Sequence, residues 1–280
     1  MKLTYEIHDL QPFVNWAYFF HAWGLRDTEQ QQQSKAEAEA LLRNLDGQYR
    51  AYGLFRLFDA NGDGDDIVLH GEDGCRLPML RQQQPDSEFL CLSDFVAPLS
   101  SGKTDRIGLF ATSVDAGMES DFDADPYQKM MTQLLADRLA EAAAEKMHEE
   151  VRRHYWGYAP DEQLTIDDQH AERFQGIRPA VGYPSLPDTS LNFLLDRVLQ
   201  FRQIGIRLTE SGAMRPHASV SGLMISLPQA RYFPLGRIGE DQLADYALRR
   251  GLPVSVIRKF LAPHVQATNR TPSFARLSTQ

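Results

Sequence analysis

A long stretch without glycine or proline, residues 127–155, constrains the fold more than any other feature of the sequence. Asp125 and Pro126 precede it, which places an N-cap residue before a proline at the first helical position. Leucines and alanines along the stretch form a broad apolar face, and acids spaced four residues apart form a stripe beside that face. The stretch therefore predicts one long helix with a single face against a core.

The other predicted elements are shorter than this helix. Two apolar runs, Leu54–Phe58 and Ile67–Leu69, flank a turn-rich segment and predict a hairpin. Further strands are predicted at 89–92, 107–112, 219–227 and 231–237, and further helices at 29–45, 191–204 and 240–250. Because strands and helices do not alternate as βαβ units require, we predict a single α+β domain over residues 1–265, with a flexible tail at 266–280.

Charge and cysteine content exclude several classes of protein. Lysine and arginine number 29 against 38 for aspartate and glutamate, and the resulting net charge of −9 repels nucleic acid and anionic membranes. No apolar run approaches the ~20 residues that a membrane-spanning helix needs, and neither terminus shows a basic and then apolar leader. The isolated Cys75 and Cys91 suit a reducing compartment. We expect a cytoplasmic protein that binds neither nucleic acid nor membrane.

Two segments approach known motifs and then depart from them. Residues 59–65 are similar to the first half of a calcium loop, but the twelfth position is His70 instead of glutamate, which favours a polar hairpin loop. Residues 100–104 are similar to a phosphate-binding loop, but Ala97 stands where its first glycine belongs. The common dinucleotide, zinc-protease and serine-hydrolase motifs are also missing from the sequence. We therefore expect no metal site in this chain.

Longer sequence segments carry a more specific signal than these short motifs. They occur in one order along the chain, at Trp16–Phe20, Asp94–Pro98, Ala136–Glu141, Tyr155–Pro160, Gly176–Pro184, Leu208–Ser211 and Ala218–Gly222. Over residues 10–265 the chain resembles the C-terminal activation domain of cobalamin-dependent methionine synthase, the module that binds S-adenosylmethionine (AdoMet). The 280 residues leave no room for the homocysteine, folate and cobalamin modules. We therefore expect a free-standing reactivation subunit.

The resemblance implies a fold and a chemistry. The fold would be a single α+β domain with a curved antiparallel sheet and flanking helices. In this family one electron, commonly from a flavodoxin, converts inactive cob(II)alamin to cob(I)alamin, which then takes a methyl group from AdoMet. A partner protein would supply the cobalamin, and this chain would bind and orient AdoMet. Because methyl transfer to a nucleophilic metal needs no general base, the resemblance implies no catalytic side chain.

The resemblance also implies which residues form the site. The predicted ligand-binding residues are Asn15, Glu141, Arg178, Ala180, Gly182, Tyr183, Tyr232 and Phe233, and Asp137 is predicted to bind the cobalamin-carrying partner. Arg178 would hold the methionine part of the ligand, since a guanidinium matches a carboxylate. The chain departs from the family at Asn15, where aspartate is common, and at Phe233, where tyrosine is. The first departure predicts weaker binding of a cationic ligand.

Other interpretations of the same residues stay open at this stage. Arg178 can form a surface ion pair, Tyr183 can be a core aromatic, and acids at helical spacing usually form a solvated stripe. At the level of function, the departures allow a non-catalytic module that binds AdoMet or serves as a scaffold for a corrinoid protein. A third hypothesis is an independent methyltransferase acting on a small acceptor.

Overall fold

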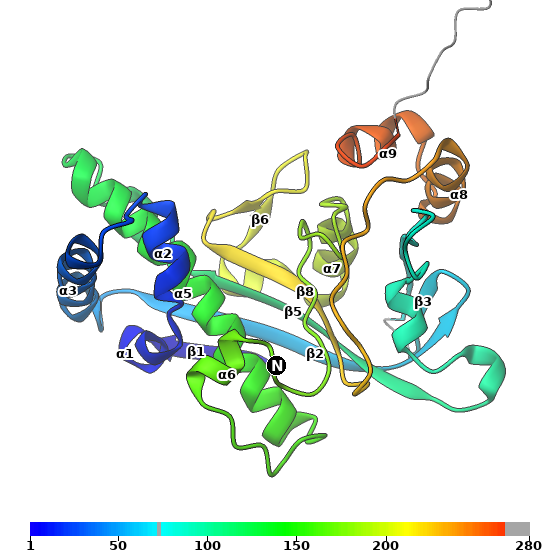
Figure 1. Ribbon diagram of the computed structural model, residues 1–280, viewed down its shortest axis with the longest axis horizontal. Helices are drawn as coiled ribbons and strands as arrows, with labels where there is room; N and C mark the ends of the chain where they lie inside the picture. The colour runs from blue at the N-terminus through cyan, green and yellow to red at the C-terminus, as the bar shows by residue number, and fades with distance from the viewer. Residues whose placement is uncertain (72–73, 267–280) are drawn as a thin grey trace, which may run out of the picture.

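Two long antiparallel strands, β2 (Arg50–Asp63) and β5 (Asp105–Val114), form the centre of a curved sheet (Figure 1). The structure is a computed structural model that describes residues 1–71 and 74–266. The sheet has the strand order β4-β3-β2-β5-β8, and β1 pairs with the start of β2. The remaining strands are β1 (Lys2–Glu6), β3 (Asp66–Leu69), β4 (Arg76–Pro78) and β8 (Ser219–Ile225), with a separate ribbon of β6 (Arg207–Leu208) and β7 (Met214–Arg215).

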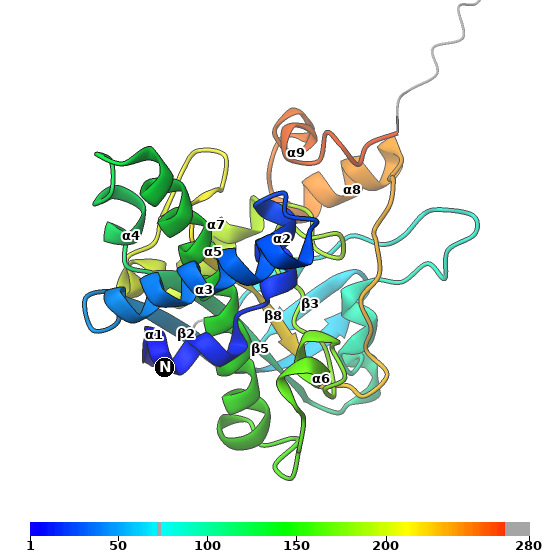
Figure 2. The same ribbon diagram turned by 60° about the vertical axis from the view of Figure 1, so that its left-hand side comes forward.

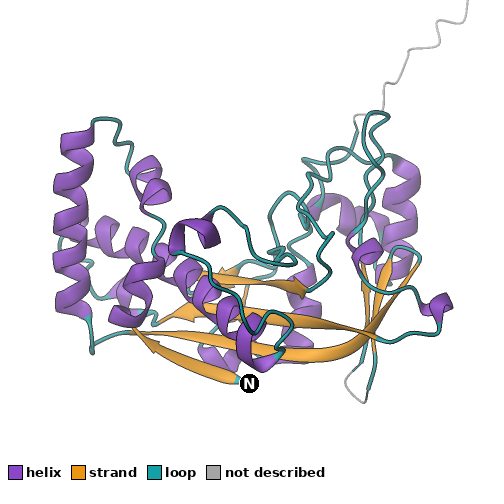
Figure 3. Ribbon diagram, turned by 60° about the horizontal axis from the view of Figure 1, so that its bottom comes forward, coloured by secondary structure: helices purple, strands orange, loops and turns teal. Residues whose placement is uncertain are grey.

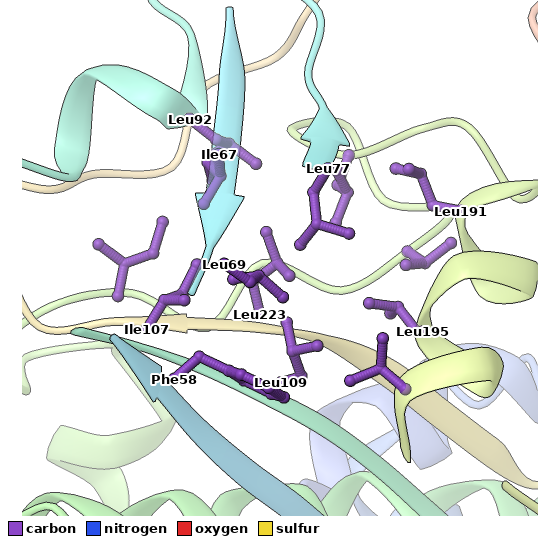
Figure 4. Packing of buried hydrophobic residues seen from close by; sticks show 14 of the residues in the cluster. Phe58, Ile67, Leu69, Leu77, Leu92, Ile107, Leu109, Leu191, Leu195 and Leu223 are labelled. Carbon is purple, nitrogen blue, oxygen red and sulfur yellow. The ribbon is translucent and has the colours of Figure 1, made fainter. Parts of the chain in front are cut away.

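Side chains alternate along each strand of the central sheet and so point to both of its faces, and an apolar cluster buries each face. On β5, Ile107 and Leu109 belong to one apolar cluster, whereas Phe110 belongs to the cluster on the opposite face. Figure 4 shows the first cluster, in which Leu191 and Leu195 face the sheet. A strand buried on both faces is expected to be almost continuously apolar, as the middle of β5 is.

Helix α5 (Pro126–Glu150) covers one face of the sheet, and α7 (Leu191–Leu199) covers the other. The side chain of Asp125 caps α5, and a π-helical turn, Val151–Tyr155, continues the helix. Figure 3 shows helices at both ends of the curved sheet, and Figure 2 shows α8 and α9 beside each other. The other helices are α1 (Ile7–Leu10), α2 (Trp16–Ala22), α3 (Thr28–Leu45), α4 (Gly117–Ser120), α6 (Ile166–His170), α8 (Glu240–Arg250) and α9 (Val254–Phe260).

Most of the predicted elements are confirmed. The long helix, the helices at 29–45 and 240–250, the strands at 107–112 and 219–227, and the hairpin of β2 with β3 are all present. The loop predicted at 59–65 is shorter in the structure, because β2 continues to Asp63 and pairs with β3 up to Asp66, which leaves only residues 64 and 65 as the turn. The helix predicted at 191–204 ends at Leu199, because the next residue adopts a positive φ of 58°.

Two predicted strands are wrong. The segment 89–92 makes only an isolated bridge at Cys91, whose amide donates to Asp94 at the end of a 3-10 turn. Residues 231–239, here called the strap, contain only an isolated bridge at Ile238 and no strand. Both backbone groups of Phe233 in the strap pair with the hydroxyl of Ser185, so they are not available to a sheet.

Residues 267–280 of the predicted tail lie outside the described residues, and the domain boundary at 265 stays a prediction. Val265 forms a bridge with Ile238. Within the described ranges, no helix combines the length and the apolar character needed to cross a bilayer.

Candidate ligand-binding site

A cleft of about 700 Å³ opens between α5, residues 178–185 and the strap. Seven of the eight predicted ligand-binding residues line it, although they come from four separate parts of the chain. The predicted residues in its wall are Asn15, Glu141, Arg178, Ala180, Tyr183, Tyr232 and Phe233. Other lining residues, which were not predicted to bind the ligand, include Tyr18, Arg138, Glu145, His170, Glu172 and Ser185.

The segment that carries Arg178 is held against the free edge of β8. Ala180 forms an antiparallel bridge with Gly222, and the backbone amide of Leu223 donates to the carbonyl of Pro179 at 3.0 Å. A Cβ atom on Gly222 would lie 2.2 Å from that carbonyl oxygen. Only glycine permits this approach, so Gly222 fixes the path of the segment and with it the position of Arg178.

Arg178 forms a buried ion pair with Glu145, and each partner keeps one unused atom. The guanidinium Nη2 donates to Glu145 Oε1 at 2.5 Å, and the two side chains are 12% and 19% exposed. Arg178 Nη1 and Glu145 Oε2 are buried without a hydrogen-bond partner among residues 1–71 and 74–266. A buried polar atom without a partner is costly, so both atoms are suited to ligand groups. The pair offers one donor and one acceptor, which match the carboxylate and ammonium of an amino acid.

Glu141 lies between two donors on the cleft wall. The hydroxyl of Tyr183 donates to Glu141 Oε1 at 3.2 Å, and Arg138 Nη1 donates to Oε2 at 2.6 Å. Burial raises the pKa of the Glu141 carboxyl, and Arg138 opposes that rise. Burial and the nearby Glu141 raise the pKa of Tyr183 to about 12, so its hydroxyl stays protonated near neutral pH.

Asn15 and Phe233, the two departures that the resemblance implies, both have structural roles. Asn15 caps α2, where its Oδ1 accepts from the amide of Ala17 at 3.1 Å. Phe233 is 5% exposed and lies edge-on to Phe95, with ring centroids 6.3 Å apart. Beside it, the hydroxyl of Tyr232 accepts a hydrogen bond from the Arg178 amide at 2.8 Å. The missing hydroxyl at Phe233 therefore leaves the packing of the cleft wall in place.

Two predicted residues lie outside the cleft. Gly182 adopts a φ of +91° in the turn before Tyr183, where it shapes the segment without lining the cleft. Asp137 pairs with His217, with Oδ1 and Nδ1 3.1 Å apart, and the Asp137 side chain is 28% exposed. Asp137 is thus partly accessible beside the site, and its role toward a partner stays a prediction.

Helical spacing could have identified two of the residues that the sequence did not single out as ligand-binding. Arg138 and Glu145 lie three positions before and four positions after Glu141 on α5, so all three share one face. Glu172 and Ser185 had no comparable signal, because irregular segments bring them to the cleft.

Comparison with known proteins identifies the family. The family model described as vitamin B12 dependent methionine synthase, activation domain, matches residues 6–251. The chain belongs to this family. A solved structure described as the MetH reactivation domain bound to AdoHcy is similar to this activation domain, with a TM-score of 0.91 and 37% sequence identity. The match covers 95% of this chain and 90% of that chain. The predicted family and the predicted curved-sheet fold are therefore confirmed.

Proposed function

We propose that this activation domain binds AdoMet in the cleft and presents its methyl group to reduced cobalamin held by methionine synthase modules. The observation that carries the proposal is the unused pair of atoms on Arg178 and Glu145 in the cleft wall. The methionine part of AdoMet has the carboxylate and ammonium that this pair matches. The solved reactivation domain, 37% identical in sequence, is bound to AdoHcy, the product that AdoMet leaves after methyl transfer.

The contribution of this chain would be binding and orientation. Reduced cobalamin held by the partner would supply the nucleophile: AdoMet would lose its methyl group as the carbon–sulfur bond breaks and a cobalt–carbon bond forms, which leaves the uncharged thioether of AdoHcy. No proton moves in this step, so no general base is required of the cleft. Arg178 and Glu145 would anchor the amino-acid end, while Tyr183, which is 51% exposed, would lie at the open side of the cleft. Fixing the donor in this way replaces a bimolecular search with an oriented encounter.

The partners belong to the same proposal. Cobalamin-binding modules of methionine synthase, supplied on a separate chain, would receive the methyl group, and a flavodoxin-like protein would supply the electron. The reaction would take place in the cytoplasm, where the free thiols of Cys75 and Cys91 stay reduced. The family assignment supports cobalamin-binding modules as the partner.

Titration calorimetry of the purified protein with AdoMet and with AdoHcy tests the proposed binding. We expect saturable binding of one molecule of either ligand per chain. If neither ligand binds at millimolar concentration, the proposed cleft assignment is wrong. Binding of AdoMet without transfer to reduced cobalamin would favour the non-catalytic module instead. Methyl transfer to a small acceptor in the absence of a corrinoid protein would favour the independent methyltransferase.

Replacing Asn15 with aspartate is expected to strengthen AdoMet binding. Aspartate is as good an N-cap as asparagine, so α2 should keep its start, and the cleft gains a negative charge. A charge-assisted contact is worth about 1 kcal/mol more than a neutral one, which predicts roughly fivefold tighter AdoMet binding. AdoHcy lacks the sulfonium charge and should gain less. Equal gains for both ligands in calorimetry would show that Asn15 does not face the sulfonium.

Reversing the charge of Asp137 is expected to weaken reactivation without changing ligand affinity. Asp137 lies outside the cleft, so Asp137→Lys should leave AdoHcy binding within about twofold of the parent, as surface changes usually do. Docking of a cobalamin module beside α5 should suffer from the reversed charge. The exposed Asp123→Lys is the control with the same charge change. Unchanged methylation rates at every concentration of the cobalamin module would remove Asp137 from the docking surface.

A further inference from the structure

The strap forms part of the cleft wall, although it contains no regular secondary structure of its own. It carries Tyr232 and Phe233, which both line the cleft. Figure 1 shows the strap as the orange-brown loop that leads to α8. Because no sheet ladder satisfies its backbone groups, other partners must hold its path. Two of these partners line the cleft: the hydroxyl of Ser185, which bonds both backbone groups of Phe233, and the carbonyl of Pro184, which accepts from the Leu235 amide at 2.9 Å.

Three consecutive glutamines that do not line the cleft also bind the strap. Each side-chain amide pairs with one strap backbone group that lies more than 150 residues away in sequence. The pairs are Gln82 Nε2 to the Pro234 carbonyl at 2.8 Å, Gln84 Nε2 to the Arg237 carbonyl at 2.5 Å, and the Gly239 amide to Gln83 Oε1 at 2.7 Å. We call Gln82–Gln84 the glutamine clasp.

The chemistry of the clasp requires an amide. Gln82 is 8% exposed, and its Oε1 accepts from the Leu90 amide at 3.1 Å while its Nε2 donates to Pro234. Only a side chain with both a donor and an acceptor satisfies these two backbone groups at once. An apolar replacement would remove the hydrogen bond to the Pro234 carbonyl and leave the Leu90 amide without its acceptor, and the strap would lose one anchor next to the two cleft residues.

We propose that the glutamine clasp positions the AdoMet site by holding the strap so that Tyr232 and Phe233 lie in the cleft wall. None of the three glutamines is among the residues that line the cleft. Any effect of the clasp on the ligand must therefore pass through the strap. The inference rests on the proposed function for the identity of the ligand. The contact between the Tyr232 hydroxyl and the Arg178 amide links the strap to the residue that is proposed to anchor the ligand.

Gln82→Met keeps the length of the side chain and removes its hydrogen bonds, so it tests the clasp. Two readouts are measured: AdoHcy affinity by calorimetry, and hydrogen exchange of the Arg178 and Phe233 amides, whose hydrogen bonds each join the strap to residues 178–185. We expect about fivefold weaker AdoHcy binding and a similar acceleration of exchange at both amides. The control is Asn61→Leu, which removes another buried amide that donates to backbone carbonyls outside the cleft.

The possible outcomes distinguish a positioning role of the clasp from a general loss of stability, and they distinguish failure of the clasp inference from failure of the proposed function. Parent-like affinity and exchange in folded Gln82→Met would overturn the inference, as would equal effects in Asn61→Leu. If Gln82→Met does not fold, Gln84→Met at the more exposed end of the clasp provides the same test. If the parent protein binds no AdoHcy, the proposed function fails, while faster exchange at Arg178 in the variant still supports the clasp.

Discussion

Replacing Arg178 with methionine is expected to weaken AdoMet and AdoHcy binding by about 2 to 5 kcal/mol, which is the usual effect of removing one partner from a buried charge contact. The variant loses the unused Nη1 donor that is proposed to hold the ligand carboxylate. It also leaves Glu145 buried without its cation. Calorimetry should therefore show no saturation at AdoHcy concentrations that saturate the parent.

A double variant separates ligand anchoring from folding. Arg178→Met combined with Glu145→Gln removes both charges of the buried pair, so no unpaired charge remains. We expect it to recover thermal stability relative to the single variant but not ligand binding. Arg173→Met, which removes an exposed arginine, should bind like the parent. Recovered binding in the double variant would show that Arg178 only supports the fold.

Replacing Gly222 with alanine is expected to lower the free energy of unfolding by about 3 kcal/mol, at the upper end for overpacked sites. The added Cβ would lie 2.2 Å from the Pro179 carbonyl oxygen and 2.9 Å from Ala180 Cα. Both are backbone atoms, so the segment that carries Arg178 must move away from β8. Ligand affinity should fall together with stability. Chemical denaturation measures the free energy of unfolding, and calorimetry of the folded variant measures ligand affinity.

Gly53→Ala is the matched control for Gly222→Ala. Gly53 also lies in a strand of the same sheet, and its added Cβ would first meet Met147 Sδ at 2.9 Å, which belongs to a flexible side chain. We expect a cost near 1 kcal/mol and parent-like ligand affinity. Equal costs for the two variants would mean that the close approach of residues 176–181 to β8 does not fix the cleft.

The elements that local patterns specify were predictable from the sequence. The N-cap at Asp125 and the stretch that follows it predict α5, and the apolar run within β5 predicts a strand buried on both faces. The strap was mistaken for a strand because its residues are apolar and aromatic. Its hydrogen bonds go to side chains such as Ser185 and Gln82, and no local pattern reveals partners so distant in sequence.

The site was predictable only in part. The resemblance pointed to Arg178, Glu141 and Tyr183, which the fold brings to one cleft. The pairing of Arg178 with Glu145 was not predicted, because it depends on how the segment along β8 lies against α5. The acids that form the stripe on α5 differ in their surroundings. Asp137 pairs with His217 outside the cleft, whereas Glu141 and Glu145 line the cleft wall.

The most direct test of the central claim is methyl transfer to cobalamin by the purified protein. A methionine synthase fragment loaded with cob(II)alamin is mixed with AdoMet, a one-electron reductant and the 280-residue chain, and the absorbance spectrum is followed. We predict methylcobalamin and one equivalent of AdoHcy, with no product when the chain is omitted or carries Arg178→Met. AdoMet that binds in the cleft but stays intact while the cobalamin is reduced would contradict the account.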